Sequence, residues 1–175
     1  MSWRLAFALL LFVSVAHAGH PAMERPLTTE DKARLTKTLG EILRDKHINQ
    51  AQYDQSISWV NAYPCQGVDR SLNSLRKAKL EEAIAKEQNR KKVTVFESFA
   101  YRGWFTLFTD ASDGDSPYMF YSSDPIKGGH PITLWSGAAT IFETSEVEQW
   151  VLQNAQSIPA VLASCFAWHV TLSPE

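Results

Sequence analysis

The sequence lacks the motifs by which most hydrolases and nucleotide-dependent enzymes are recognised. It contains no G-x-S-x-G nucleophile elbow, no G-x-x-x-x-G-K-[ST] phosphate loop and no G-x-G-x-x-G fingerprint. Its five histidines form no H-E-x-x-H pair or other zinc-ligand spacing. We therefore expect neither a metal nor a cofactor, and we favour a binding protein over an enzyme.

Long apolar runs are also scarce, and the run that resembles a targeting signal lies at the N-terminus. Arg4 precedes the uninterrupted apolar stretch Leu5–Val13, and Ala16-His17-Ala18 provides the small-x-small pattern of a cleavage site. Nine apolar residues are too few for a membrane span, which needs ~20. No later run is long enough either, and no cysteine follows the cleavage site to carry a lipid. The sequence predicts a signal peptide over residues 1–18 and export to the periplasm.

Positive charge is not in excess, which disfavours a nucleic-acid partner. Cleavage after Ala18 would remove Arg4 and no acid, so the net charge would go from −2 to −3. The mature chain of roughly 160 residues is long enough for one domain with a proper core. Residues 19–27 contain two prolines without periodicity and predict a flexible N-terminal arm. Residues 28–175 are expected to form a single domain.

Cysteine is limited to Cys65 and Cys165, both in the mature part. Two thiols in an exported protein usually pair, and this bond would stabilise the fold by ~4–5 kcal/mol in the chain-entropy model. The alternatives are a metal-ligand pair and a catalytic thiol that uses His169. On the strand expected there, residues four apart are separated by ~13 Å. We therefore favour the disulfide.

Hydrophobic periodicity predicts an α+β fold. Three N-terminal helices are expected, after a cap at residues 28–29, after Asn49, and over residues 71–89. From Val93 onward, β-branched and aromatic residues dominate. The strands predicted from this change cover residues 93–101, 103–109, 118–122, 132–135 and 138–143. A capping box at residues 145–148 predicts another helix, and the alternation over residues 166–172 predicts a last strand. The sheet would thus be mostly antiparallel with five to six strands.

An acidic loop is the most distinctive segment of the strand-rich half. Asp110, Asp113 and Asp115 stand within six residues, interrupted by Ser112 and Gly114. The spacing does not fit an EF-hand, which leaves three interpretations: a turn, a protein-binding loop, or another cation site. We select the protein-binding interpretation as the working hypothesis.

Aromatic residues crowd the same strands. Adjacent pairs such as Trp104-Phe105 must point to opposite faces of a strand. Such a sheet is either covered on both faces or exposes an aromatic patch, and Tyr and Trp are favoured anchors at protein interfaces. We predict that Trp104 and Tyr118 join the acidic loop in binding a partner.

The whole layout resembles the periplasmic immunity proteins that protect bacteria from antibacterial type VI secretion toxins. The likeness consists of the Leu5–Val13 signal, the Cys65/Cys165 pair and an α+β body without catalytic motifs, which carries the aromatic-flanked acidic loop. It is a likeness of organisation, without a shared motif. It implies a protein that binds one toxin, such as a phospholipase, peptidoglycan hydrolase or metalloprotease. The loop aspartates would steer a basic toxin surface, and Tyr118 or Trp104 would fill a pocket.

Two other functions stay open at the level of sequence. One is a small periplasmic hydrolase that uses His130 and a loop aspartate as acid and base. The other is a solute-binding or structural protein of the cell envelope. A pocket lined by the strand aromatics would favour the solute-binding function, whereas a flat exposed patch would favour a protein partner.

Overall fold

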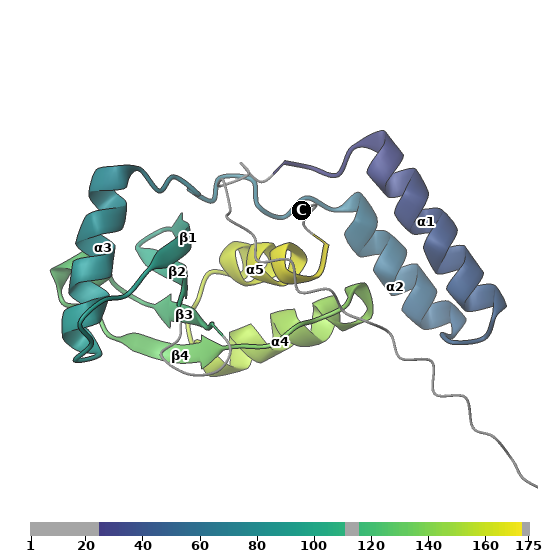
Figure 1. Ribbon diagram of the computed structural model, residues 1–175. Helices are drawn as coiled ribbons and strands as arrows, with labels where there is room; N and C mark the ends of the chain where they lie inside the picture. Colours follow the sequence, from purple (N-terminus) through teal and green to yellow (C-terminus); the bar gives the residue numbers. More distant parts are fainter. Residues whose placement is uncertain (1–24, 111–115, 173–175) are drawn as a thin grey trace, which may run out of the picture.

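The computed structural model describes residues 25–110 and 116–172 as five α-helices around a small antiparallel sheet (Figure 1). The predicted signal peptide, residues 1–18, lies outside the described residues, as does most of the predicted arm. Leu27, which we had assigned to the arm, is buried against the core. Within the described ranges, no helix is long and apolar enough to cross a bilayer.

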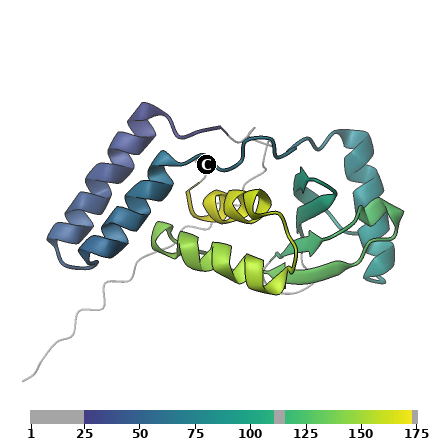
Figure 2. The same cartoon turned by 180° about the vertical axis from the view of Figure 1, so that it is seen from behind.

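The first two helices form an antiparallel hairpin, α1 (Thr29–Arg44) and α2 (Gln50–Asn61). Both begin with capping boxes: Thr28 pairs reciprocally with Asp31, and Asn49 with Gln52. The sequence predicted the Asn49 box, whereas for the first helix it predicted a cap at residue 28 or 29 without its reciprocal partner. The hairpin lies at the opposite end of the molecule from α3 (Figure 2). Trp59 Nε1 attaches it to the body by donating a 2.8 Å hydrogen bond to Ser145 Oγ.

The third helix, α3 (Ser74–Glu87), begins three residues later than predicted. Asn73 caps it by accepting a hydrogen bond from the backbone N–H of Arg76. Its buried residues Leu80 and Ile84 lie on one face of the sheet, where they pack with Leu107 and Met119.

The sheet is a four-stranded antiparallel meander in the order β1-β2-β3-β4. Its strands are β1 (Val95–Tyr101), β2 (Trp104–Thr109), β3 (Tyr118–Tyr121) and β4 (Pro131–Trp135). β1 and β2 are joined by a tight turn in which Arg102 and Gly103 both have positive φ. A short 3₁₀ helix, η1 (Pro125–Lys127), interrupts the connection from β3 to β4.

The prediction of a fifth strand at residues 138–143 was wrong. Residues 136–139 have no regular structure, and the 3₁₀ helix η2 (Ile141–Glu143) leads directly into α4 (Thr144–Asn154). Glu143 accepts hydrogen bonds from the Thr140 backbone N–H (2.8 Å) and hydroxyl (2.8 Å). This local capping offers the backbone an alternative to a sheet ladder.

The prediction of a final strand at residues 166–172 was also wrong, because these residues belong to α5 (Ala160–Leu172). The alternation was broken by Ala167, which is as fully buried as its neighbours Phe166 and Trp168. A segment that is apolar on all sides is typical of a buried helix. Seven residues are too few to separate the two periods when a helix is buried around its whole circumference.

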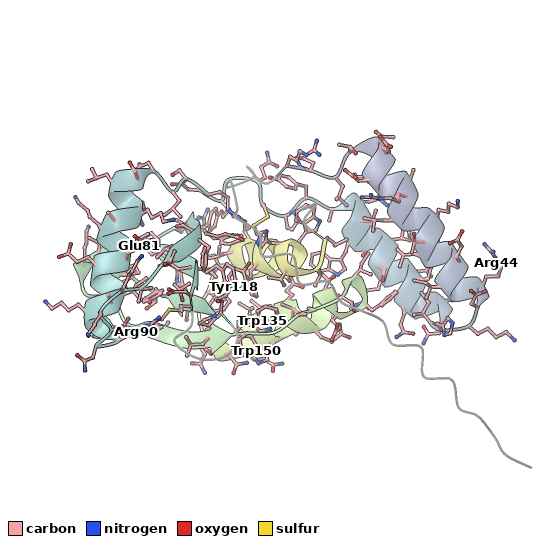
Figure 3. All side chains as sticks on the ribbon, in the orientation of Figure 1. Arg44, Glu81, Arg90, Tyr118, Trp135 and Trp150 are labelled. Atoms are coloured by element: carbon pink, nitrogen blue, oxygen red, sulfur yellow. A yellow bond between two sulfur atoms is a disulfide. The ribbon has the colours of Figure 1, made fainter. Side chains whose placement is uncertain are left out.

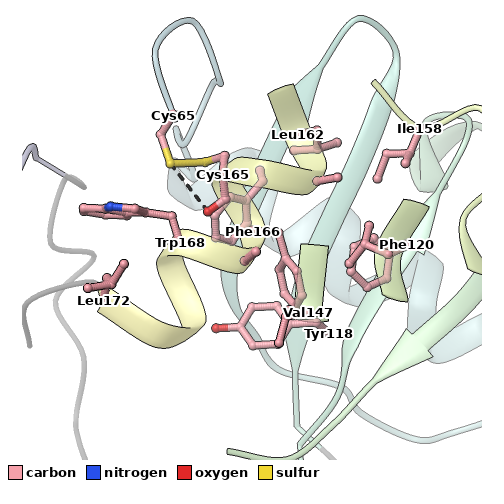
Figure 4. Close-up of a cluster of buried hydrophobic side chains, with 14 of the residues drawn as sticks. Cys65, Tyr118, Phe120, Val147, Ile158, Leu162, Cys165, Phe166, Trp168 and Leu172 are labelled. Atoms are coloured by element: carbon pink, nitrogen blue, oxygen red, sulfur yellow. Dashed lines mark hydrogen bonds between the residues drawn. A yellow bond between two sulfur atoms is a disulfide. The ribbon is translucent and has the colours of Figure 1, made fainter. Parts of the chain in front are cut away.

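α5 lies between the α1–α2 hairpin and the sheet (Figure 1), and with α4 it covers the second face of the sheet. Figure 4 shows Phe166 of α5 packed beside Tyr118 and Phe120. Phe166 contacts Tyr118, Phe120 and Trp135 edge-on, with ring centroids 4.9–5.4 Å apart. The sheet is therefore covered on both faces, by α3 on one and by α4 and α5 on the other.

The predicted disulfide is confirmed. The sulfurs of Cys65 and Cys165 lie 2.14 Å apart and the Cα atoms 4.6 Å apart. Cys65 follows the end of α2, and Cys165 lies in the middle of α5. The bond therefore connects the segment between α2 and α3 to the central helix.

Candidate functional site

A β-bulge at the start of β1 exposes an aromatic side chain next to a charged cluster. Val95 is opposite Thr109 and Glu97 is opposite Phe108, so Phe96 is an extra residue without a partner on β2. A bulge redirects side chains that would otherwise alternate. The Phe96 side chain is 44% exposed, whereas Val95 is fully buried.

The Phe96 ring packs against a row of aromatic rings that leads into the core. Its ring lies 5.4 Å from that of Phe108, which stacks on Tyr118 at 4.6 Å. Tyr118 in turn contacts Phe166 in α5 at 5.0 Å. An exposed aromatic side chain is thus continuous with the core, which restricts its motion.

A charged cluster lies immediately beside Phe96. Glu97 Oε2 is 2.7 Å from His169 Nε2 and 3.0 Å from Arg70 Nη2. The Tyr118 hydroxyl lies 3.2 Å from the same His169 nitrogen. The cluster joins β1, β3, α5 and the segment that follows the disulfide. We call Phe96, Glu97, Phe108, Tyr118, His169 and Arg70 the bulge site.

Glu97 is ionised at neutral pH. Burial by itself would raise its pKa, but the His169 hydrogen bond and charge, together with Arg70, outweigh burial and hold the pKa below its usual value. The Arg70 guanidinium also lies over the Phe99 ring, 3.4 Å from its centroid. The carboxylate is therefore held by both Arg70 and His169.

His169 has a different environment from the one predicted. We expected it on a strand, and the structure places it on α5 in contact with Glu97. It does lie one helical turn from Cys165, but that residue is disulfide-bonded and therefore has no nucleophilic thiol. Nothing in the periodicity brought residues 97 and 169 together, because their contact depends on how α5 packs against β1.

The structure describes the residues on either side of positions 111–115 of the acidic loop, among them Asp110. Asp113 and Asp115 lie outside the described residues. Asp110 accepts a 2.9 Å hydrogen bond from the Thr94 backbone N–H and lies 3.5 Å from Arg90 Nη1. Its carboxylate thus fastens the loop to the start of β1, close to Phe96, and is already used within the chain.

The two predicted aromatic anchors are in different places. Tyr118 is 8% exposed and belongs to the aromatic core of the bulge site (Figure 3). Trp104 is half-buried and begins β2, whereas the acidic loop follows the last residue of that strand. Six residues of strand span about 17 Å, so Trp104 and the loop lie at opposite ends. Phe96 is the exposed aromatic residue beside the loop, which the sequence did not single out.

His130 is exposed and its Nδ1 lies 3.4 Å from Glu87 Oε1 at the end of α3. It precedes β4 at the end of the sheet where β3 finishes, whereas Asp110 lies near the start of β3. The described part of the acidic loop therefore does not form an acid–base pair with His130.

The best-formed depressions in the described surface lie away from the bulge site, one along α1 at residues 30–37 and one at the start of α3 beside Ile126. Among the described residues, no three His, Cys, Asp or Glu side chains are placed to hold a metal ion. The bulge site is thus a supported surface feature with an aromatic residue at its edge.

Comparison with known proteins gives no information on the function of this chain. No family model, no curated protein and no solved structure matches this chain.

Proposed function

We propose that this chain is an exported binding protein, most consistent with a periplasmic inhibitor that neutralises a toxin. The observation that supports this best is the exposed Phe96 side chain, which is supported by aromatic packing beside the acidic loop. Rigid aromatic side chains are typical hot spots of protein interfaces. Because Phe96 is already ordered by Phe108, little of its conformational entropy is lost on binding.

The neighbouring charges have two different roles in this proposal. Glu97 is paired with His169 and Arg70 within the chain, and these contacts keep the bulge in shape. The aspartates at 113 and 115 supply negative charge that steers a basic surface of the toxin. The partner thus contacts an apolar anchor with an acidic margin.

A direct test places a photo-crosslinking phenylalanine analogue at position 96 of the periplasmic protein. The matched control carries the analogue at Leu75, which is 67% exposed on α3. We expect the position-96 protein to form a crosslink with an effector encoded beside its gene, and the position-75 protein to form none. Equal crosslinking at both positions would contradict the assignment of the surface.

The functional consequence is measured with Phe96→Ala and Leu75→Ala. We expect Phe96→Ala to weaken toxin binding by at least about tenfold, the loss expected for an interface anchor, and to reduce protection of cells. Leu75→Ala should change neither. Full protection by Phe96→Ala would eliminate the bulge site, and failure of the wild-type protein to bind or protect would eliminate toxin inhibition.

A further inference from the structure

Charge is distributed unevenly along this chain. Residues 70–92, which contain α3 and the segments beside it, carry eight basic and three acidic side chains, a net charge of +5. The whole sequence has a net charge of −2, so all other residues together carry −7. α3 lies at the opposite end of the molecule from the α1–α2 hairpin (Figure 1). The protein therefore has one basic end and an acidic remainder.

Half of these basic side chains are used within the fold. Each of the four forms an ion pair of 3.0–3.8 Å with a described carboxylate: Arg70, Arg76, Lys77 and Arg90. The other four are exposed lysines that form no ion pair with residues 25–110 or 116–172, and η1, which packs against α3, adds a fifth. We call these five lysines the basic face: Lys79, Lys86, Lys91, Lys92 and Lys127.

The basic face follows the outer side of α3, away from the sheet. Lys79 and Lys86 are seven residues apart, so they lie on the same side of the helix two turns from each other. Leu75, one turn before Lys79, continues this side and is 67% exposed. Glu82 is exposed between the two lysines, but one carboxylate leaves a clear excess of positive charge. The outer side of α3 thus combines several unpaired cations with one apolar side chain.

These side chains favour a lipid surface over a folded protein as the partner. Protein interfaces are enriched in Arg and aromatic residues and depleted in Lys. The basic face consists of lysines alone, and residues 70–92 contain no Phe, Trp or Tyr. A lysine ammonium is a hydrated point charge on a flexible stem, which suits headgroups that have no fixed positions. Leu75 adds an apolar side chain that can enter the interfacial region of a bilayer.

We propose that the basic face binds reversibly to an anionic phospholipid bilayer, with α3 lying against the headgroups. The negative potential of such a surface attracts basic side chains and repels the acidic remainder of the chain, so the charge distribution also orients the protein. α3 covers one face of the sheet, whereas Phe96 packs against Phe108 on the face that α5 covers. The bulge site is therefore free to bind a partner while the protein is attached to the bilayer.

The test is co-sedimentation of the mature protein with vesicles of phosphatidylcholine and phosphatidylglycerol in a ratio of roughly two to one. We expect binding to these vesicles, none to pure phosphatidylcholine, and release at high salt, because salt screens the attraction. Lys79→Gln/Lys86→Gln/Lys91→Gln should bind about a hundredfold more weakly, since each lysine near an anionic surface contributes roughly fivefold to the affinity. Leu75→Ala retains all five lysines and should therefore stay attached. Circular dichroism confirms that each variant is folded.

The matched control is Lys37→Gln/Arg44→Gln/Lys46→Gln, which removes the same charge from exposed positions of the α1–α2 hairpin. Its affinity should change by less than about twofold, because salt screens charges more than ~8 Å from the bilayer. The proposal is overturned if the wild-type protein does not bind anionic vesicles, if it binds neutral vesicles equally well, or if both triple variants lose the same affinity. Binding to poly-glutamate but not to vesicles would overturn it in favour of an acidic polypeptide partner. None of these outcomes depends on toxin binding.

Discussion

The two edges of the same sheet are treated differently by this chain. The β1 edge is covered: Asp69 and Ala100 exchange two backbone hydrogen bonds of 2.8 Å, and Glu81 Oε1 accepts one of 3.1 Å from the Val95 N–H. The β4 edge has none of these contacts among the described residues. One edge is thus covered within the chain, whereas none of the described residues pairs with the outer side of the other.

The cover of β1 depends on long-range connections. Asp69 and Arg70 lie in the segment that starts at Cys65, which the disulfide joins to α5. The Arg70–Glu97–His169 cluster then fixes the same segment to both β1 and α5. The disulfide and the Arg70–Glu97–His169 cluster thus both hold the segment that covers the β1 edge, where the bulge site lies.

The largest effect is expected from opening the covered edge. Replacing both cysteines by Ala should lower the free energy of unfolding by about 4–5 kcal/mol, because the unfolded chain loses a constraint on about a hundred residues. Urea unfolding measures this loss. Hydrogen exchange should show faster exchange at Ala100 than at residues of β3. Equal protection of the Ala100 amide in the wild-type protein and the double Cys→Ala variant would show that the β1 edge stays covered without the disulfide.

Removing the carboxylate at the bulge should have the next largest effect. Glu97→Ala leaves Arg70 and His169 partly buried beside each other without their shared anion, and should cost about 2–3 kcal/mol. Ile132→Ala on the open edge is the matched control and should cost less than about 1 kcal/mol, since its side chain is already exposed. Chemical denaturation of dilute protein gives both values, and similar costs would refute the contrast between the edges.

Acid should weaken the covered edge selectively. The Glu97 pKa is lowered from its ordinary value of 4.5, so below that pH the unfolded chain binds more protons than the folded protein. Stability should therefore fall as the pH drops below about 4.5 toward the lower folded pKa. Glu97→Gln should reduce this dependence, as measured by thermal unfolding between pH 3 and 7. An unchanged slope in Glu97→Gln would assign the acid sensitivity to other carboxylates.

The smallest effect is expected from charges on the open edge. Ile132→Lys/Leu134→Lys should change the unfolding free energy of the monomer by no more than about 0.5 kcal/mol per site, because exposed substitutions rarely exceed this value. The measurement is made at low concentration, where association does not contribute. A loss of several kcal/mol would show that these side chains belong to the core of the single chain.

Local signals located most of the secondary structure. The cap expected at Thr28 or Thr29 and the capping box at Asn49 marked helix starts within a residue, and the change of composition near Val93 marked the beginning of the sheet. These signals act over three to four residues and need no tertiary context. They failed at residues 138–143, where the local capping of Thr140 by Glu143 replaces a strand. They also failed at residues 166–172, where the burial of neighbouring positions hides the periodicity that separates strand from helix.

The candidate site was less accessible from sequence. The acidic loop follows β2 at the end of the sheet where the bulge lies, but Trp104 lies at the other end and Tyr118 is in the core. Phe96 and Glu97 stood in an ordinary strand pattern, and the bulge that distinguishes them has no reliable sequence signature. A charged residue within an apolar strand was the one available sign that Glu97 has partners elsewhere.

The sequence by itself determined the pairing of Cys65 with Cys165, the helix caps and the α+β class, because each follows from residue types or from neighbours close in the chain. The tertiary structure alone decided that His169 meets Glu97 and Arg70, that Phe96 is exposed, and that one sheet edge is covered while the other is open. These features join residues up to about a hundred positions apart. Their energies depend on packing geometry, which no short window of sequence contains.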